Sequence, residues 1–210
     1  MEDIEGYKEY NAVAISSLDK DLREQQWTQC ADRLRLITDA LGKPIDTGIF
    51  DTVVALNIFD IHTTQSCEGH AEHGTLAPWV EIQAPETDET KKLRKRVART
   101  MQTIEALEKQ GKSDEELNGL YQTFHRLNEE LRRPQLEEIQ KVMILLEKFY
   151  KDRQVDYSQL LIIHGNRLES QGAQLQSIIP SDERGQKLDL YQKEMKSFTE
   201  FLKGMHLIGS

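Results

Sequence analysis

The sequence predicts an α+β fold, in which a small antiparallel sheet of about four strands has flanking helices and is interrupted by a long antiparallel helical hairpin. Most of the 210 residues follow the three- and four-residue apolar spacing of amphipathic helices. Four short stretches instead alternate apolar and polar residues, as half-buried strands do. Two of them precede the longest helical region and two follow it. We therefore predict that residues 1–86 and 153–210 form one α+β domain and that residues 87–152 are an inserted arm.

Three helices are predicted to flank the sheet. From Ser17 to Leu41 apolar residues recur at helical spacing, and Gly42 and Pro44 then supply a stop signal. A shorter helix is predicted from about Thr47 to Asn57. The last helix is predicted to start at residues 180–183 and to carry one apolar stripe, formed by Leu188, Tyr191, Met195, Phe198 and Leu202.

The four strands are predicted to form two hairpins. The first strand runs from Ile61 to Cys67, and the second from Pro78 to Gln83, with the proline at its beginning, where a missing N–H does least harm. The third runs from Gln159 to His164 and the fourth from Arg167 to Gln171. Gly165-Asn166 between the last two is typical of a two-residue hairpin turn.

The arm is predicted to be a coiled-coil-like pair of helices. Apolar residues at alternating four- and three-residue spacing form its seam, namely Leu93, Val97, Ile104, Leu107, Leu117, Leu120, Phe124, Leu127 and Leu131. Ser113 and Glu116 form a capping box that opens the second helix. Pro134 is predicted to kink or break that helix, because proline has no N–H to donate to the preceding turn.

The composition indicates a cytoplasmic protein. The formal net charge is −9, which argues against a whole-protein attraction to nucleic acid or anionic lipid. No run approaches the roughly 20 apolar residues that cross a bilayer, so no membrane association is expected. The acidic start lacks the features of a secretory signal. Two cysteines, Cys30 and Cys67, do not make a disulfide framework, which indicates a reducing compartment.

The stretch TTQSCEGHAEHG, residues 63–74, is the strongest candidate for a functional site. Cys67, His70 and His73 place three good zinc ligands within seven residues, each three positions from the next. Zinc accepts such a mixed sulfur and nitrogen set. Three protein ligands would leave a fourth position for water, as in catalytic zinc sites, with Glu68 or Glu72 as the candidate base for hydrolysis.

Further candidates lie outside the turn. His62 and Cys67 are an odd number of positions apart on a strand, so their side chains are predicted to point to opposite faces unless a bulge intervenes. Glu72, Glu81 and His164 are better candidates for an outside ligand. Trp79, which follows the histidine-rich loop directly, is a candidate wall of a pocket that also holds Glu81 and His164.

Three alternatives to a metal site stay open. Cys67 can act as a thiol nucleophile, with His70 or His164 as its base and Glu68 or Glu81 as the orienting group. A type II turn at Gly69 can present successive N–H groups to an anion. The turn can also be purely structural, since cysteine is often a small buried apolar residue.

The order T-T-x-S-C-E-G-H, a short His/Gly loop and A-P-W-V-E-I resembles a group of bacterial and phage proteins of unknown function. These proteins share an SCxGH turn followed by a Pro-aromatic strand, and the resemblance covers about residues 47–84. It implies a family signature of Ser66, Cys67, Glu68, Gly69, His70, Pro78 and Trp79, and no particular activity. A more distant resemblance is to the SCSG turn of the wybutosine-synthesis tRNA methyltransferases, which have Arg at the position of His70.

The arm supplies the second function hypothesis, that of a non-enzymatic interaction or oligomerisation protein. Residues 87–152 are then predicted to form a homodimer or to bind a protein partner, with Tyr121, Phe124, Phe149 and Tyr150 as candidate surface. Six cations at the start of the arm are a candidate patch for nucleic acid: Lys91, Lys92, Arg94, Lys95, Arg96 and Arg99. The alternative is that glutamates of the opposite helix neutralise them: Glu129, Glu130, Glu137 and Glu138.

Overall fold

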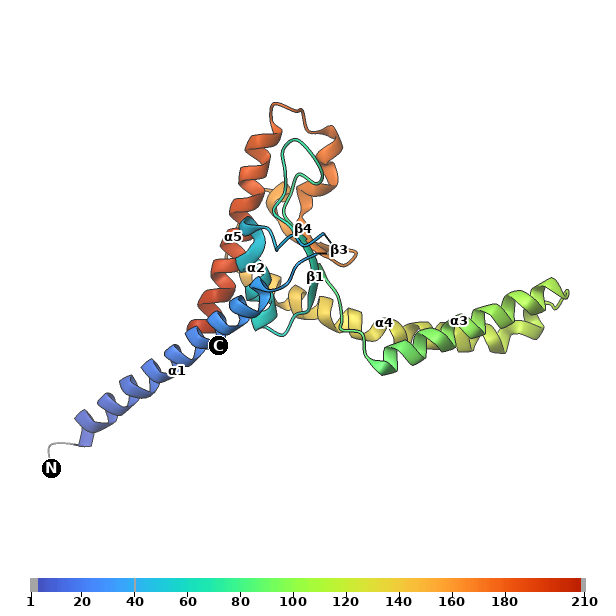
Figure 1. The fold of residues 1–210 in the computed structure, drawn as a ribbon, viewed down its shortest axis with the longest axis horizontal. Helices are drawn as coiled ribbons and strands as arrows, with labels where there is room; N and C mark the ends of the chain where they lie inside the picture. The colour runs from blue at the N-terminus through green and yellow to red at the C-terminus, as the bar shows by residue number, and fades with distance from the viewer. Residues whose placement is uncertain (1–3, 40, 209–210) are drawn as a thin grey trace. The chain divides into compact units, whose positions relative to one another are not determined.

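The computed structural model describes residues 4–39 and 41–208 and confirms the α+β fold. The described chain packs as two compact units (Figure 1). One unit contains the residues up to Ile82 together with those from Lys141 onward, and the other is Gln83–Gln140. No helix among the described residues is long and apolar enough to cross a membrane.

The sheet of the first unit has four antiparallel strands in the order β1-β2-β4-β3. Their bounds are Thr63–Cys67 for β1, Trp79–Ile82 for β2, Leu161–His164 for β3 and Arg167–Ser170 for β4. The pairing of β2 with β4 joins the two predicted hairpins, and Trp79 pairs with Cys67 on one side and Glu169 on the other. A bulge interrupts β1 between Thr63 and Ser66. Its position matters for the site because Cys67 ends the same strand.

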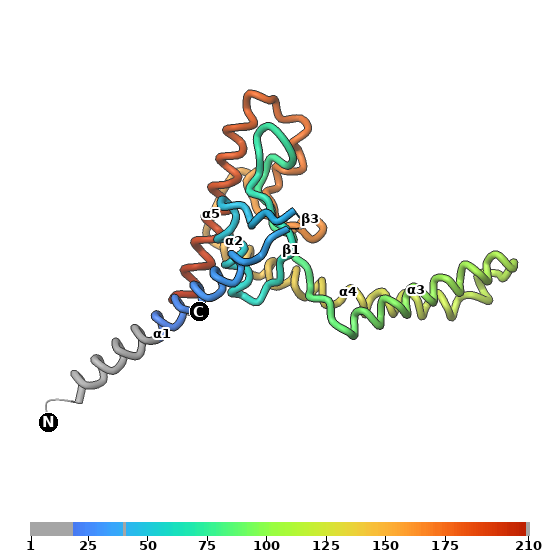
Figure 2. The backbone as a smooth tube through the Cα atoms, in the orientation of Figure 1, coloured from blue at the N-terminus to red at the C-terminus, as the bar shows by residue number. Residues whose placement is uncertain are grey.

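Helices pack around this sheet through a main apolar core, and Leu76, Ala77 and Tyr191 form a second, smaller cluster. The helices are α1 (Ile4–Arg35), α2 (Thr47–Ile58) and α5 (Arg184–Ile208), with short 3-10 helices at Tyr157–Gln159 and Gln171–Ile178. In Figure 2 the backbone of α2 lies beside α5, and the fully buried Val54 and Leu56 of α2 share a core with Phe198 and Leu202 of α5. Removing this apolar surface from water is the main stabilising contribution to the unit.

The first helix ends earlier than its apolar spacing predicts. It stops at Arg35 rather than Leu41. The Asp39 carboxylate accepts hydrogen bonds from the backbone N–H groups of Leu41 and Lys43, both at 2.8 Å, and Thr38 forms an isolated bridge with Pro44. A local turn built on an aspartate side chain thus replaces the last helical turn.

Pro134 does not break the second arm helix, and this prediction of a break is wrong. Helix α4 runs from Asp114 to Tyr150 with the proline inside it. Packing beyond the proline compensates for the missing hydrogen bond, because four apolar residues of the last three turns lie in the core of the first unit: Val142, Leu145, Leu146 and Phe149. Residues 141–150 therefore belong to the first unit, whereas the sequence predicts an arm that extends to 152.

The second unit is a helical hairpin formed by α3 (Asp88–Lys109) and the first part of α4 (Figure 1). Ile104, Leu117 and Leu127 of the predicted seam are buried in it. The predicted capping box is present, because Ser113 N–H donates to the Glu116 carboxylate at 3.0 Å and Glu116 N–H donates to Ser113 Oγ at 3.4 Å. The Lys112 ammonium, with help from Ser113, lowers the pKa of Glu116.

A buried carboxylate ties α4, α5 and β3 together. The side chain of Glu194 is only 4% exposed. It accepts hydrogen bonds from Arg153 Nε at 3.1 Å and from the Tyr150 hydroxyl at 3.0 Å, and Arg153 Nη2 forms an ion pair with it. The same hydroxyl accepts from Leu161 N–H at 2.8 Å. Burial raises the pKa of Tyr150, so the hydroxyl keeps its proton and can donate at any physiological pH.

We expect Arg153→Met to lower the free energy of unfolding by about 2–4 kcal/mol, because it leaves the buried Glu194 carboxylate without its charge partner. Urea unfolding at pH 7 measures this change. Lys151→Met is the matched control, because it also removes one positive charge, two residues away, from a side chain that is exposed. Equal unfolding midpoints for the two variants would show that the Arg153–Glu194 pair contributes nothing.

Candidate functional site

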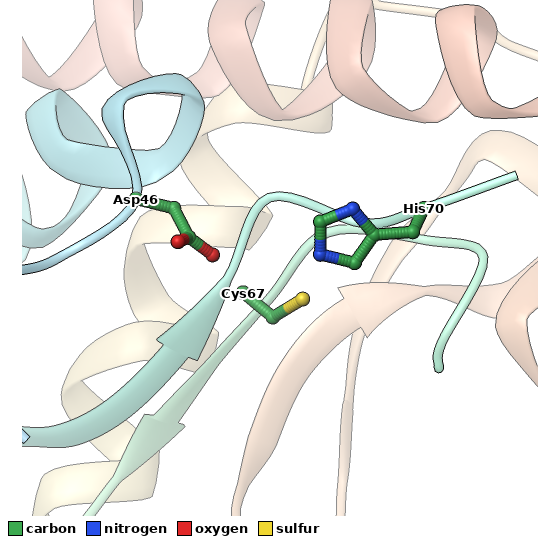
Figure 3. Close-up of side chains that lie close together, drawn as sticks. All are labelled: Asp46, Cys67 and His70. Atoms are coloured by element: carbon green, nitrogen blue, oxygen red, sulfur yellow. The ribbon is translucent and has the colours of Figure 1, made fainter. Parts of the chain in front are cut away.

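Three side chains from separate segments converge at the end of β1. One carboxylate oxygen of Asp46, the sulfur of Cys67 and one ring nitrogen of His70 all lie within 4.8 Å of one another. Figure 3 shows the three groups directed at a common space from the residue before α2, from the end of β1 and from the turn that follows it. All three keep some exposure to solvent. We call this group the Asp46/Cys67/His70 cluster.

Asp46 reaches the cluster because it does not cap its own helix. It occupies the N-cap position of α2, yet its side chain makes no capping hydrogen bond there. Its Oδ2 instead accepts from the Glu68 N–H at 3.4 Å. The Glu68 side chain in turn binds the start of α2, where its Oε2 accepts a hydrogen bond from the Gly48 N–H at 2.8 Å. Glu68 thus caps the helix and Asp46 is left facing Cys67 and His70.

Gly69 makes the turn between Cys67 and His70. Its φ of +83° lies in the left-handed region that favours glycine. A Cβ added there would lie 2.6 Å from the Leu76 carbonyl oxygen, so the turn also needs the absence of a side chain. His70 N–H donates to the Thr75 carbonyl at 2.9 Å and closes the loop. In the sequence pattern C-x-G-H, the glycine is therefore required by the backbone of the turn, and the cysteine and histidine supply candidate ligands.

Helix α5 holds the same turn from outside. Gln192 Nε2 donates to the Glu68 carbonyl at 2.9 Å, and Arg184 Nε donates to the Ala71 carbonyl at 2.7 Å. These bonds satisfy backbone groups that the loop itself leaves unpaired. They also limit the movement of the residues on both sides of His70.

The sulfur of Cys67 faces two donors. Gly69 N–H lies 3.4 Å from it and the Thr75 hydroxyl lies 4.0 Å from it. Thr75 is oriented in turn by Trp79, whose indole Nε1 donates to the Thr75 hydroxyl oxygen at 2.8 Å. Donors of this kind orient a ligand and offset negative charge on a metal-bound thiolate.

His73, the third predicted ligand, lies outside the three-residue cluster. Its exposed ring stacks on that of His70, with centroids 4.4 Å apart and planes 13° from parallel. Asp46 takes the place in the cluster that the sequence assigns to His73. From the sequence, Asp46 could be recognised only as an N-cap residue before Thr47. The side chain of an N-cap aspartate normally accepts a hydrogen bond from the first turn of its own helix, so a ligand role was not expected.

The structure separates the other candidate residues from the cluster. Glu68 is engaged in the bond to Gly48, and Glu72 is exposed. Glu81 accepts from the Asn166 side-chain amide at 2.7 Å. The His164 ring nitrogen Nδ1 lies 3.4 Å from the Glu169 carboxylate. His62 also lies outside the cluster. The bulge in β1 lies between His62 and Cys67, so the simple alternation of side chains between the two faces of the sheet does not hold there.

A cleft of about 450 Å³ lies next to the cluster. Asp46 belongs to both, and Ser66 and Trp79, the chain neighbour and the strand partner of Cys67, line the cleft. Its other walls come from the end of α1, from the segment between α1 and α2, from α2 itself and from β1: Leu34, Ile37, Thr38, Asp39, Lys43, Pro44, Ile45, Val53, Thr63, Thr64 and Gln65. The predicted pocket role of Trp79 fits this position. Arg167 stacks on the Trp79 ring, 3.9 Å from its centroid.

Comparison with known proteins finds no family model, no curated protein and no solved structure that matches this chain. The resemblance of the SCEGH turn to bacterial and phage proteins and to the wybutosine-synthesis enzymes stays a prediction.

We expect Gly69→Ala to destabilise the protein by about 3 kcal/mol, through both left-handed backbone strain and the contact with the Leu76 carbonyl. Gly74→Ala is the matched control, because Gly74 has a φ of +64° and open space around its Cβ position. It should cost only about 1 kcal/mol. Thermal unfolding compares the two, and equal losses would mean that close packing at Gly69 is unimportant.

We expect Glu68→Ala to cost about 1–2 kcal/mol, because it removes the acceptor for the first turn of α2. Glu72→Ala should leave stability unchanged, since Glu72 is exposed. Urea unfolding of both variants is the measurement. A stable Glu68→Ala protein would contradict the capping role and favour the alternative in which Glu68 is held for chemistry.

Proposed function

We propose that this chain binds a transition-metal ion, zinc before others, through Asp46, Cys67 and His70. The observation that carries the proposal is the convergence of one oxygen, one sulfur and one nitrogen within 4.8 Å of one another. Carboxylate, thiolate and imidazole are the three ligand types that zinc takes in proteins. A mixed set of this kind suits a borderline-soft ion better than magnesium or calcium, which prefer oxygen ligands.

The surroundings of the cluster support a metal more than a thiol nucleophile. A nucleophilic cysteine needs a base within hydrogen-bond reach and a third group that orients the base. Among the described residues, no hydrogen bond joins His70 to Cys67 or to Asp46. The three groups point into a shared space, and the Gly69 and Thr75 donors lie on the sulfur, as expected for a supported metal ligand.

Three protein ligands suggest a hydrolytic site. Zinc with three protein ligands keeps its fourth position for water, and bound zinc makes that water a nucleophile near neutral pH. The adjacent cleft gives a substrate access to the ion, because Asp46 lines both. Of the two residues predicted as a base, Glu68 is held at α2 and Glu72 is exposed outside the cluster, so neither is assigned that role.

We expect untagged protein, purified from cells grown with added zinc, to contain about one zinc ion per chain by elemental analysis. Cys67→Ser, His70→Ala and Asp46→Asn should each lose most of the metal, because each removes one ligand. His73→Ala and Cys30→Ser are matched controls and should retain it, since both residues lie outside the cluster. In protein loaded with cobalt, a thiolate-to-metal charge-transfer band should be present and should vanish in Cys67→Ser.

Chelation provides the second measurement. A metal that binds only the folded chain stabilises it, so removing the metal should lower the melting temperature by several degrees. Metal content well below one ion per chain, together with a melting temperature that chelation does not change, would disprove the proposal. The turn would then be structural, and the interaction hypothesis for the arm would replace it.

A further inference from the structure

One flank of α3 carries four exposed cations that form no ion pair with any residue between 4 and 208 that the structure describes. They are Lys92, Lys95, Arg96 and Arg99. Their spacing of three, four and seven residues from Lys92 places all of them on one side of the helix. At a rise of 1.5 Å per residue they extend over about 10 Å. We call this set the basic stripe.

The other two cations of the predicted patch are already paired. Lys91 Nζ lies 3.9 Å from the Glu86 carboxylate and 4.0 Å from Asp88, and Arg94 forms an ion pair with the same glutamate. The structure therefore divides the run of six cations into a neutralised flank and an open flank. The linear sequence does not make this division.

The expected neutralisation from the opposite helix does not reach the basic stripe. Glu129, Glu130 and Glu137 of α4 form no ion pair with it in the part of the chain that the structure describes. A row of unpaired charges on an exposed helix adds nothing to folding stability. Its free charge is available to an external anion.

We propose that the basic stripe binds the phosphate backbone of double-stranded nucleic acid without reading its sequence. Phosphates of one strand follow each other about every 3.4 Å along the duplex axis, so a stripe of about 10 Å meets roughly three of them. Arg96 and Arg99 add planar donors that fit phosphate oxygens, and the lysines add point charges.

Features of the stripe favour nucleic acid over other anionic partners. It contains no aromatic residue on which an unpaired base could stack, which argues for a duplex over a single strand. Its neighbours on the same flank are exposed and polar: Asp88 and Glu89 before Lys92, and Gln102 and Thr103 after Arg99. A protein partner or a lipid surface would require an apolar centre or an apolar face there.

The excess negative charge of the chain is concentrated outside residues 83–140. Residues 83–140 hold eleven Lys and Arg against twelve Asp and Glu, whereas the whole chain holds 27 against 36. Most of the excess negative charge therefore lies outside the unit that carries the stripe.

The test uses the full chain and a fluorescent duplex of arbitrary sequence, with affinity measured by anisotropy over a range of salt concentrations. We expect binding with a slope of log affinity against log salt near −3, from about three phosphate contacts. The stripe variant Lys92→Gln/Lys95→Gln/Arg96→Gln/Arg99→Gln should lose about tenfold or more in affinity and most of that slope. Circular dichroism checks that its helices are retained.

The matched control removes four other cations of the same unit: Lys91→Gln/Arg94→Gln/Lys109→Gln/Lys112→Gln. It should bind almost as tightly as the unchanged chain. Equal losses in the two variants, or no duplex binding even at low salt, would overturn the proposal. Stripe-dependent binding that is tighter to polyglutamate or to anionic vesicles than to the duplex would also overturn it, in favour of an acidic protein or a membrane.

Discussion

The exchange of hydrogen bonds between Asp46 and Glu68 is the constraint on which the candidate site depends. Glu68 accepts from the first turn of α2, and Asp46 accepts from the backbone of Glu68, so the helix start and the strand end hold each other. Both carboxylates lie beside the N-terminus of α2, where the positive end of the helix dipole is located. Without this exchange Asp46 would cap its own helix, as N-cap aspartates usually do, and the cluster would contain only Cys67 and His70.

The turn that carries Cys67 and His70 is held from three directions. Gly69 permits its tight backbone, Thr75 closes it, and α5 binds its carbonyl groups through Gln192 and Arg184. Such support is what a ligand set requires, because metal ligands must keep their geometry to within about half an ångström. The three proposed ligands nevertheless remain partly exposed, and a cleft lies beside them. This combination of a supported turn and exposed side chains supports the proposed metal site.

The arm shows how much of this chain follows from local pattern. Seam residues, the Ser113–Glu116 capping box and the Gly165-Asn166 turn were predictable, because each depends on neighbours within a few positions. The position at which the arm ends was not predictable from the spacing. Residues 141–150 continue the same helical spacing, yet Val142, Leu145, Leu146 and Phe149 pack in the core with α5 and the sheet. Pro134 is likewise predicted to kink or break the helix, whereas α4 continues through it to Tyr150.

Local sequence patterns were sufficient to predict the fold class, the order of helices and strands, and the turn with Cys67 and His70. These follow from apolar periodicity and from the backbone preferences of Gly69, which act over short distances along the chain. Tertiary packing brings Asp46 to this pair and stacks His73 beside it. It also pairs Lys91 and Arg94, whereas the basic stripe forms no ion pair with the residues that the structure describes. Each of these contacts joins side chains that are brought together only when helix starts and strand ends pack against each other. Sequence spacing along the chain does not specify that packing.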